Sequence, residues 1–364
     1  MNKLILLLAT LSVCACGPTE KSAQGYEDYS WEGKESYLQK SEVVKVDTVI
    51  DYILQIQPYG DRFLVEYPYD WAVFHRQGET LSFERYLIRK GEGPEESLSS
   101  MRYARMDDGR CFFGECIGSR KVFIAPSAGE GAYAPLVSWK KQRFTGAEKY
   151  YFESLQPVDD EVVLGGVQGD CPSKFVVSNL QTGVSSPLEG APYPPLYAEL
   201  SDFKKSFVTE GFLLKRPGSQ RYFYGATVGL YAFVFDCDGQ SIRNVRMLYN
   251  RPAPFVSRGE QGSRPRLTDG TSAYNAPPFV TDRCIYLSAR HVSVKDAFSD
   301  HPSEVLPYIF TKEIVAFRWD GTPFRKYILD EPVRGFFVDE EKSLLYGFGA
   351  NDQNGDVILV YDLQ

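Results

Sequence analysis

Apolar residues along this chain recur in short alternating runs, which is the pattern of β-strands with one buried and one exposed side. One unit occurs three times with the same layout: an apolar pair, a turn closed by glycine, and a resumed strand. The copies span residues 73–81, 234–242 and 316–324. Because glycine permits the positive φ of tight turns, each copy predicts a β-hairpin. Asp-rich and Gly-rich turns predict further inner hairpins at residues 103–114 and 335–346.

The spacing of these units predicts the fold. Looser copies begin at Val122, Val176 and Val360, so that successive units lie 44 to 58 residues apart, with one interval of 82. A four-stranded propeller blade has a period of about 40 to 50 residues. We therefore expect an all-β chain whose residues 42–364 form a single six-bladed β-propeller domain. A seventh blade is the alternative, since the long interval has room for one.

The C-terminal end of the chain predicts how the ring closes. The last unit stops at Gln364, which leaves no residues for a fourth strand. We expect an N-terminal strand to join the last blade, formed by residues 43–50 or by residues 52–56. Such closure removes an open strand edge that would invite aggregation. Within the 82-residue interval, residues 249–278 are rich in Pro, Gly, Ser and Arg, and we expect a long inserted loop there.

The N-terminus has the pattern of a bacterial lipoprotein signal peptide. Lys3 precedes an apolar run at residues 4–13, and the small Ala15 lies directly before Cys16. The run is shorter than the roughly 20 apolar residues that span a bilayer. We expect residues 1–15 to be removed on export, Cys16 to carry the lipid that anchors the protein to a membrane, and residues 16–41 to form a polar tether. The alternative is an ordinary secretory signal cut after Ala15.

Charge and cysteine content narrow the classes of partner and site. The net charge of −8 repels polyanions over most of the surface, so no nucleic-acid partner is expected. Cys111 and Cys116 can form a disulfide only if the chain turns near Gly114, because a bridge needs Cα atoms within about 7 Å. The cysteines and the three histidines are scattered along the sequence, so no structural zinc site is predicted.

A segment after the first predicted unit carries a family resemblance. It reads Arg-Lys-Gly-Glu-Gly-Pro-Glu-Glu from residue 89. Together with the repeat and the leader, it resembles the TolB-like six-bladed β-propeller lipoproteins of Bacteroidetes, in which Arg-x-Gly-x-Gly-Pro-x-Glu follows the first blade. The matching residues are Arg89, Gly91, Gly93, Pro94 and Glu96. The resemblance spans residues 40–364 and implies the fold and an envelope location; the family is largely uncharacterised, so it implies no activity.

The same segment is interpreted first as a structural connector. Gly91 and Gly93 permit unusual backbone angles, Pro94 sets the exit direction, and the carboxylates can accept from free amides or pair with Arg89. A ligand loop is the alternative. A phosphate cradle would need a Lys-Ser/Thr ending, and the three glutamates would repel phosphate.

No catalytic residues are predicted. The chain has no Gly-x-Ser-x-Gly elbow, and its histidines lie far apart in sequence. Calcium is the one ion left open, since carboxylates in several turns could meet at the mouth of the channel. The candidate residues are Asp107, Asp108, Asp159, Asp160, Asp282 and Asp339. Aspartate is also favoured in turns for backbone reasons, and that is the preferred interpretation; no cofactor is expected.

Positive charge concentrates in the inserted segment of this acidic chain. Arg258, Arg264 and Arg266 are candidates for contacts with an anion, because guanidinium groups bind carboxylates with two hydrogen bonds. A solvated loop is the simpler interpretation.

These observations lead to two functional hypotheses. The first is a membrane-anchored, non-enzymatic propeller that binds a protein, peptide or glycan at one end of its channel. The second is a metal-dependent propeller hydrolase or lyase that acts on a carbohydrate or lactone. Either would be an outer-membrane lipoprotein of the bacterial envelope, facing the periplasm or the cell surface; the oligomeric state is left open.

Overall fold

The computed structural model describes most of the chain after residue 28. The described residues are 29–46, 53–59, 61–67, 70–93, 96–97, 101–115, 121–127, 134–143, 150–256, 266–267, 272–273, 277–289, 292–293, 310–352 and 355–363. Cys14, Cys16, Cys116 and the predicted signal peptide lie outside them. No helix of this described part is long and apolar enough to cross a membrane.

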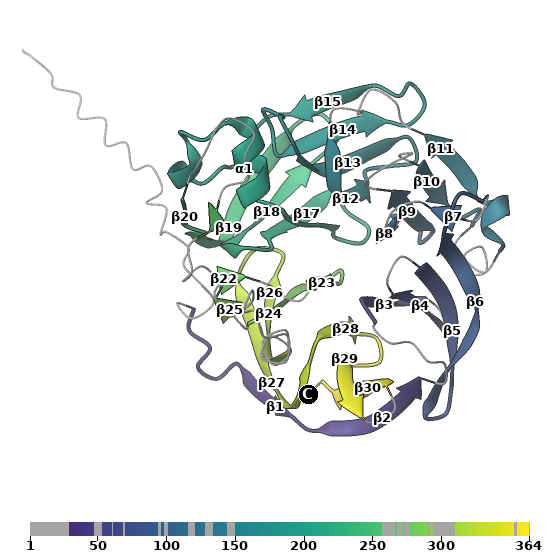
Figure 1. Cartoon of the computed structure of the whole chain (residues 1–364). Coiled ribbons are helices and arrows are strands. Elements are labelled where there is room, and N and C mark those ends of the chain that lie inside the picture. The colour runs from purple at the N-terminus through teal and green to yellow at the C-terminus, as the bar shows by residue number, and fades with distance from the viewer. Residues whose placement is uncertain are drawn as a thin grey trace, which may run out of the picture.

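Within the described residues, the main strands form six antiparallel groups of four around a central axis (Figure 1). The strands of each group follow one another from the innermost outward. Group 1 is β3 (Gln55–Tyr59), β4 (Arg62–Tyr67), β5 (Asp70–Gln77) and β6 (Thr80–Lys90); group 2 is β8 (Met101–Arg105), β9 (Cys111–Glu115), β10 (Lys121–Ile124) and β11 (Lys140–Arg143); group 3 is β12 (Tyr151–Pro157), β13 (Val162–Gln168), β14 (Phe175–Asn179) and β15 (Ser185–Leu188).

The second half of the chain builds three more groups in the same way. Group 4 is β16 (Gly211–Lys215), β17 (Arg221–Ala226), β18 (Gly229–Cys237) and β19 (Ile242–Pro252); group 5 is β23 (Phe279–Val280), β24 (Cys284–Ser288), β26 (Thr311–Arg318) and β27 (Pro323–Val333); group 6 is β28 (Gly335–Asp339), β29 (Leu344–Asp352), β30 (Gly355–Asp362) and β2 (Lys40–Val46). The fold is therefore all-β and propeller-like.

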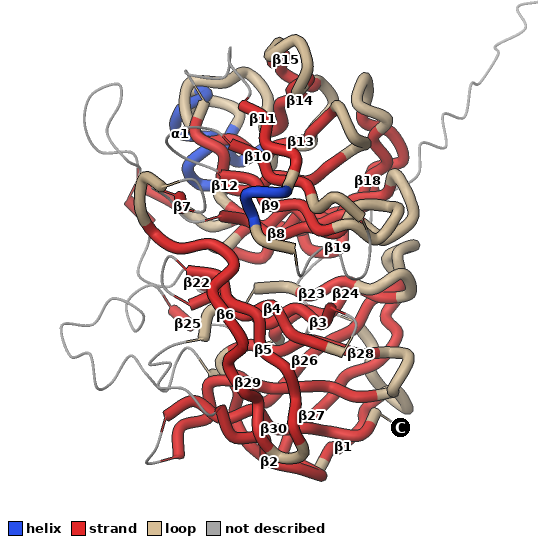
Figure 2. Tube along the Cα trace, turned by 90° about the vertical axis from the view of Figure 1, so that its right-hand side faces the viewer, coloured by secondary structure: helices blue, strands red, loops and turns tan. Residues whose placement is uncertain are grey.

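Short elements decorate this frame. They are β1 (Glu35–Leu38), β7 (Glu96–Ser97), the pair β20 (Phe255–Val256) and β21 (Arg266–Leu267), the pair β22 (Ser272–Ala273) and β25 (Val292–Ser293), the 3-10 helices η3 (Leu136–Ser138) and η4 (Pro195–Tyr197), and α1 (Asp202–Val208). In side view, α1, β7, β22 and β25 lie toward the same end of the ring (Figure 2).

The predicted hairpins are confirmed. The three close copies of the repeat are β5–β6, β18–β19 and β26–β27, and their turn glycines Gly78, Gly239 and Gly321 have φ values of 60°, 85° and 81°. The inner hairpins at residues 103–114 and 335–346 are parts of β8–β9 and β28–β29. Each repeat unit is thus the outer half of one four-stranded group.

Of the two N-terminal strands that the sequence offers for the place beside the last strand, β2 takes it. Val44 pairs with Ile358 of β30 in antiparallel register, while Lys45 at its other edge pairs in parallel with Thr80 of β6. Residues 55–59, which overlap the second candidate, instead form β3, the innermost strand of group 1. β2 therefore links the first and last groups into one sheet.

Residues 29–41, which the sequence analysis assigns to the polar tether, lie against the ring. Trp31 is buried against Phe317, with ring centroids 5.5 Å apart, and the Tyr29 hydroxyl donates to the Leu248 carbonyl at 2.6 Å. β1 then pairs in parallel with the outer edge of β27. Burial of two aromatic rings outweighs the polar composition of the segment.

The core consists of six apolar clusters, and each cluster joins two neighbouring groups of strands. Aromatic rings fill the interfaces: Phe337 and Tyr346 stack at 4.4 Å, and Trp71 of group 1 meets Phe113 of group 2 at 5.0 Å. One cluster packs group 6 against group 1. The clusters account for the high aromatic content of the chain.

Trp71 offers a test of this packing. Its side chain is 1% exposed, and its indole N–H donates to the Met101 carbonyl of group 2 at 3.0 Å. We expect Trp71→Ala to lower the free energy of unfolding by about 3–5 kcal/mol, through a cavity and an unpaired carbonyl, measured by urea denaturation. Tyr37→Ala, at a ring 72% exposed, should change it by less than about 0.5 kcal/mol. Equal effects of the two variants would contradict the assignment of the core.

Candidate functional site

A cavity of about 970 Å³ opens at one end of the central channel. Residues from all six groups line it, mainly the turns that join the first and second strands of groups 2, 4, 5 and 6. These turns surround the axis because the innermost strands face it (Figure 1). The volume is at the upper end of the range for small-molecule sites, which is about 300–1,000 Å³.

Most acidic side chains of the cavity are already held by partners. Asp107 forms an ion pair with Lys215 at 2.9 Å, and the Lys215 ammonium, on a side chain only 2% exposed, also donates to the Val158 carbonyl at 3.1 Å. Asp108 binds the Arg110 guanidinium at 2.6 Å. The backbone N–H of Arg110 and this guanidinium lower the pKa of Asp108, although partial burial opposes them.

The turn between β28 and β29 holds two more carboxylates in place. Asp339 pairs with Lys342 at 2.9 Å and also accepts the Lys342 backbone N–H at 3.0 Å. Glu340 accepts the Tyr286 hydroxyl at 2.7 Å. Burial is the main cause that raises the pKa of Tyr286, which therefore stays a neutral donor. These acids stabilise the rim of the cavity.

Four charged side chains of the cavity have no hydrogen-bond or ion-pair partner for their charged groups among the described residues. They are Arg105, Asp282, Arg283 and Glu341, all exposed. Arg105 ends β8 in group 2, whereas the other three lie in the turns of groups 5 and 6. The cavity thus presents unpaired charges of both signs on different sides.

The aromatic rings of the cavity are engaged in the core. Tyr103 packs against Trp71 and Phe113, with centroids 5.9 and 5.5 Å away. Phe279 lies 6.3 Å from Phe337 in the same manner. Both rings are partly buried, which limits the area on which a sugar can stack.

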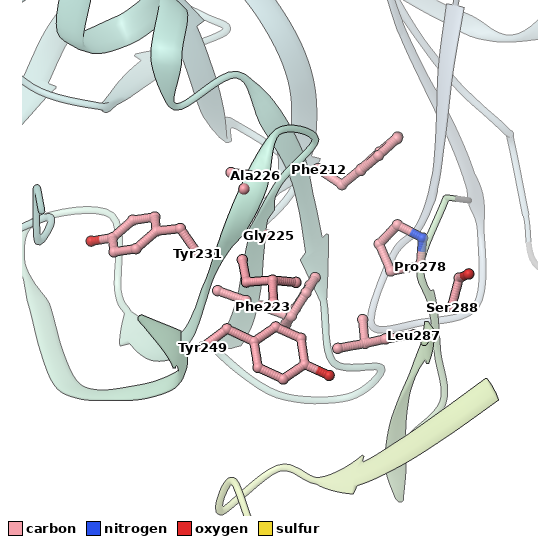
Figure 3. A pocket seen from close by; sticks show the side chains of 12 residues that line it. Phe212, Phe223, Gly225, Ala226, Tyr231, Tyr249, Pro278, Leu287 and Ser288 are labelled. Atoms are coloured by element: carbon pink, nitrogen blue, oxygen red, sulfur yellow. The ribbon is translucent and has the colours of Figure 1, made fainter. Parts of the chain in front are cut away.

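A second, smaller pocket is apolar. It has a volume of about 30 Å³ and lies between groups 4 and 5, where Phe212, Phe223, Tyr249, Pro278 and Leu287 surround it (Figure 3). None of its lining residues is charged. It is far smaller than the channel cavity, and the polar side chains of its lining are the hydroxyl groups of Tyr231, Tyr249 and Ser288.

Two buried acids are not predicted from the sequence. Glu153 is the bulge residue of β12, ion-paired with the buried Lys174 at 2.7 Å and accepting the Tyr224 hydroxyl at 2.8 Å. Burial raises the pKa of Glu153 to about 7 and lowers the pKa of Lys174. Glu66, with Arg102 3.9 Å away, also has its pKa raised to about 7 by burial. No local sequence pattern marks these positions.

The loop of the family resemblance is built from its own hydrogen bonds. The Gly93 N–H donates to the Glu96 carboxylate at 2.7 Å, and the Gly91 N–H donates to the Ser97 carbonyl at 3.0 Å. The Arg89 guanidinium lies over the Tyr86 ring at 4.8 Å and does not pair with Glu96. Pro94 lies outside the described residues. The geometry fits a connector, and none of the described residues of this loop lines the channel cavity.

The six aspartates that could contribute to a calcium site lie in two kinds of environment. Of the six candidate aspartates, Asp107, Asp108, Asp282 and Asp339 line the cavity. Asp159 instead accepts the Val162 N–H at 2.8 Å within its turn, and Asp160 pairs with Arg110. In the described part of the chain, no group of three or more His, Cys, Asp or Glu residues could hold a metal ion.

Several candidates lie beyond what is described. Arg258 and Arg264 fall outside the described residues, and Arg266 is described only as a backbone position of β21. Cys111 is a free thiol in a strand, and burial raises its pKa to about 12. The anion-contact role of the three arginines stays a prediction.

Comparisons with known proteins bear on the fold. No protein-family model matches the chain, and no curated protein matches it in sequence. A protein of Bacteroides fragilis described as exported has a TM-score of 0.51 and 11% identity, over 91% of this chain and 99% of that one. A DUF4221 family member from Bacteroides vulgatus has a TM-score of 0.54 and 12% identity, over 89% and 97%.

This chain shares their fold. At such low identity, the likeness shows the fold alone. The TolB-like assignment made on the segment from Arg89 is not addressed by these matches and stays a prediction.

The raised pKa of Glu66 predicts a pH dependence. Between about pH 4.5 and 7 the native state keeps a proton that the unfolded chain releases. This stabilisation is fully present below about pH 4.5 and is lost as the pH rises through 7. Relative to Glu66→Gln, we expect the wild type to lose about 2–3 kcal/mol between pH 4.5 and 8, by denaturant titration. Glu79→Gln, at an exposed turn, is the control; parallel curves for wild type and Glu66→Gln would refute the assignment.

Proposed function

We propose that this chain is a lipid-anchored, non-enzymatic six-bladed β-propeller that binds a protein, peptide or glycan in the cavity at one end of its channel. The turns between the first and second strands of groups 2, 4, 5 and 6 lie at this end. The observation that carries the proposal is the cavity itself, about 970 Å³ in volume and lined from all six groups of strands. A rigid ring that presents variable turns around one opening is a common way to build a binding site on a scaffold.

The strand groups support the blade count and the closure. Each group packs on both neighbours through an apolar cluster, so every group has the environment of a blade. The pairing of β2 with β30 supplies the fourth strand of the last blade from the N-terminus. We infer six blades in a closed ring, which leaves no blade with an unpacked face.

Binding is favoured over metal-dependent hydrolysis by the state of the carboxylates. Asp107, Asp108 and Asp339 each pair with a cation of the protein, and Glu340 accepts a hydroxyl. A calcium site needs several carboxylate or carbonyl oxygens that converge on one point. Only the carboxylates of Asp282 and Glu341 remain without a partner among the described acids of the lining, and no observation favours the hydrolase or lyase alternative.

The proposed location in the cell envelope rests on the predicted signal peptide at residues 1–15. The small residue before Cys16 supports lipid attachment at that thiol and a place on the outer membrane, facing the periplasm or the surface. Several acyl chains give stable anchoring, since each buried methylene contributes roughly 0.8 kcal/mol. The likeness to a Bacteroides protein described as exported agrees with this address.

A bulky residue in the cavity tests the binding site. Gln57 lies half-buried on β3 and lines the cavity. We expect Gln57→Trp to weaken at least tenfold the binding of any ligand that the wild type captures from arrays of oligosaccharides and tetrapeptides. Gln240→Trp, at an exposed turn outside the cavity, is the matched control. Capture of no ligand, or equal capture by the two variants, would overturn the proposal.

Lipidation has a separate test. In a bacterial host supplied with an alkyne-tagged fatty acid, we expect the wild type and Cys14→Ser to take up the label and Cys16→Ser to lose it, because only the thiol at Cys16 carries the diacylglycerol. The readout is in-gel fluorescence after coupling of a dye, with detergent partitioning as a second measure. Retained label in Cys16→Ser would show that the anchor is elsewhere or absent.

A further inference from the structure

The unpaired charges at the channel mouth are arranged asymmetrically. Arg105, in group 2, is the only unpaired charge on its side among the described lining residues. On the side of groups 5 and 6, Asp282 and Glu341 outnumber Arg283. The unpaired groups therefore sum to one positive charge on one side and one negative charge on the other.

These two sides lie on different parts of the ring. Going from neighbour to neighbour, two groups of strands separate group 2 from group 5 in either direction, and group 1 separates group 2 from group 6, which carries Glu341. In Figure 1, β8 and β23 lie on different sides of the centre. A ligand that satisfies both sets of charges must therefore span the mouth.

The lining also argues against a neutral sugar. Tyr103 and Phe279 are the two aromatic residues of the described lining, and both are partly buried against core rings, which limits the stacking area that they offer to a sugar. A neutral glycan would also leave the unpaired ions without a counter-charge while displacing the water around them, which is costly. A ligand with one charge of each sign at its two ends avoids both problems.

We propose that the cavity binds a short linear peptide with both termini free, whose carboxylate lies at Arg105 and whose ammonium lies at Asp282 and Glu341. This inference rests on the proposed binding function and names its ligand class. The Arg105 guanidinium can bind a carboxylate with two hydrogen bonds. The two carboxylates can accept from the three N–H donors of an ammonium. Half-buried Gln57 lines the same cavity and can bond to the peptide backbone between the ends. The amide of buried Gln156, which also lines the cavity, already donates to the Leu213 carbonyl at 3.0 Å.

The test compares four forms of tetra-alanine on the purified full chain by isothermal titration calorimetry. The forms have both ends free, the amine acetylated, the carboxylate amidated, or both ends blocked. We expect blocking either end to weaken binding at least tenfold, because each end loses a charge-assisted hydrogen bond. Tri- and hexa-alanine establish which length spans the mouth.

Variants assign each end to its side chains. Arg105→Gln should bind the free and the amidated peptide equally, and should keep its preference for a free amine. The double variant Asp282→Asn, Glu341→Gln should show the reverse behaviour. Arg143→Gln and Glu79→Gln, at exposed positions outside the cavity, are matched controls and should behave as the wild type. Every altered position, in the variants and in the controls, is exposed, so the fold should tolerate the changes.

The outcomes separate this inference from the proposed function. Peptide binding that ignores the state of the termini, or that Arg105→Gln leaves unchanged, overturns the inference. If no peptide of the series binds but oligosaccharides bind and Gln57→Trp blocks them, the peptide assignment is overturned while the binding function stands. If neither class binds, both fail.

Discussion

The structure depends on the packing of each sheet face against the next through large aromatic side chains. Sheets pack about 10 Å apart, and rings such as Trp71, Phe113, Phe337 and Tyr346 have the size to fill that gap. Because six such interfaces follow one another around the ring, every group of strands is covered on both faces. Weakening one interface would expose the faces of two sheets at once.

This constraint decides where function can lie. Most strand residues are committed to the interfaces, while the exposed side chains of the turns between first and second strands border the central opening. These exposed side chains can change without loss of the core, as is usual for loops carried on a rigid scaffold. Lys215 connects the two regions: its side chain is buried between groups, and its ammonium holds Asp107 at the rim.

Local patterns predicted the hairpins well, and long-range burial could not be predicted. Alternating apolar residues closed by Gly78, Gly239 or Gly321 specify a hairpin within ten residues, so sequence alone is enough. Tyr29 and Trp31 stand among Glu and Lys, and their burial depends on a site almost 290 residues away at Phe317. Of the six aspartates that the sequence offers for the channel mouth, four line the cavity. Sequence alone cannot select these four, because aspartate is favoured in any turn, whether or not the turn faces the channel.

Charge acts locally in this molecule. The net charge of −8 disfavours polyanions as a class, but it does not describe the channel mouth, where ion pairs neutralise three of the six acids of the described lining. Buried ions such as Glu153 and Lys174 must pair with each other, because an unpaired ion between sheets is strongly destabilising. At the mouth, solvent removes that requirement, and charges can stay unpaired. Under the proposed binding function, selectivity would depend on the few ions that have no partner among the described residues, such as Arg105, more than on the total charge of the chain.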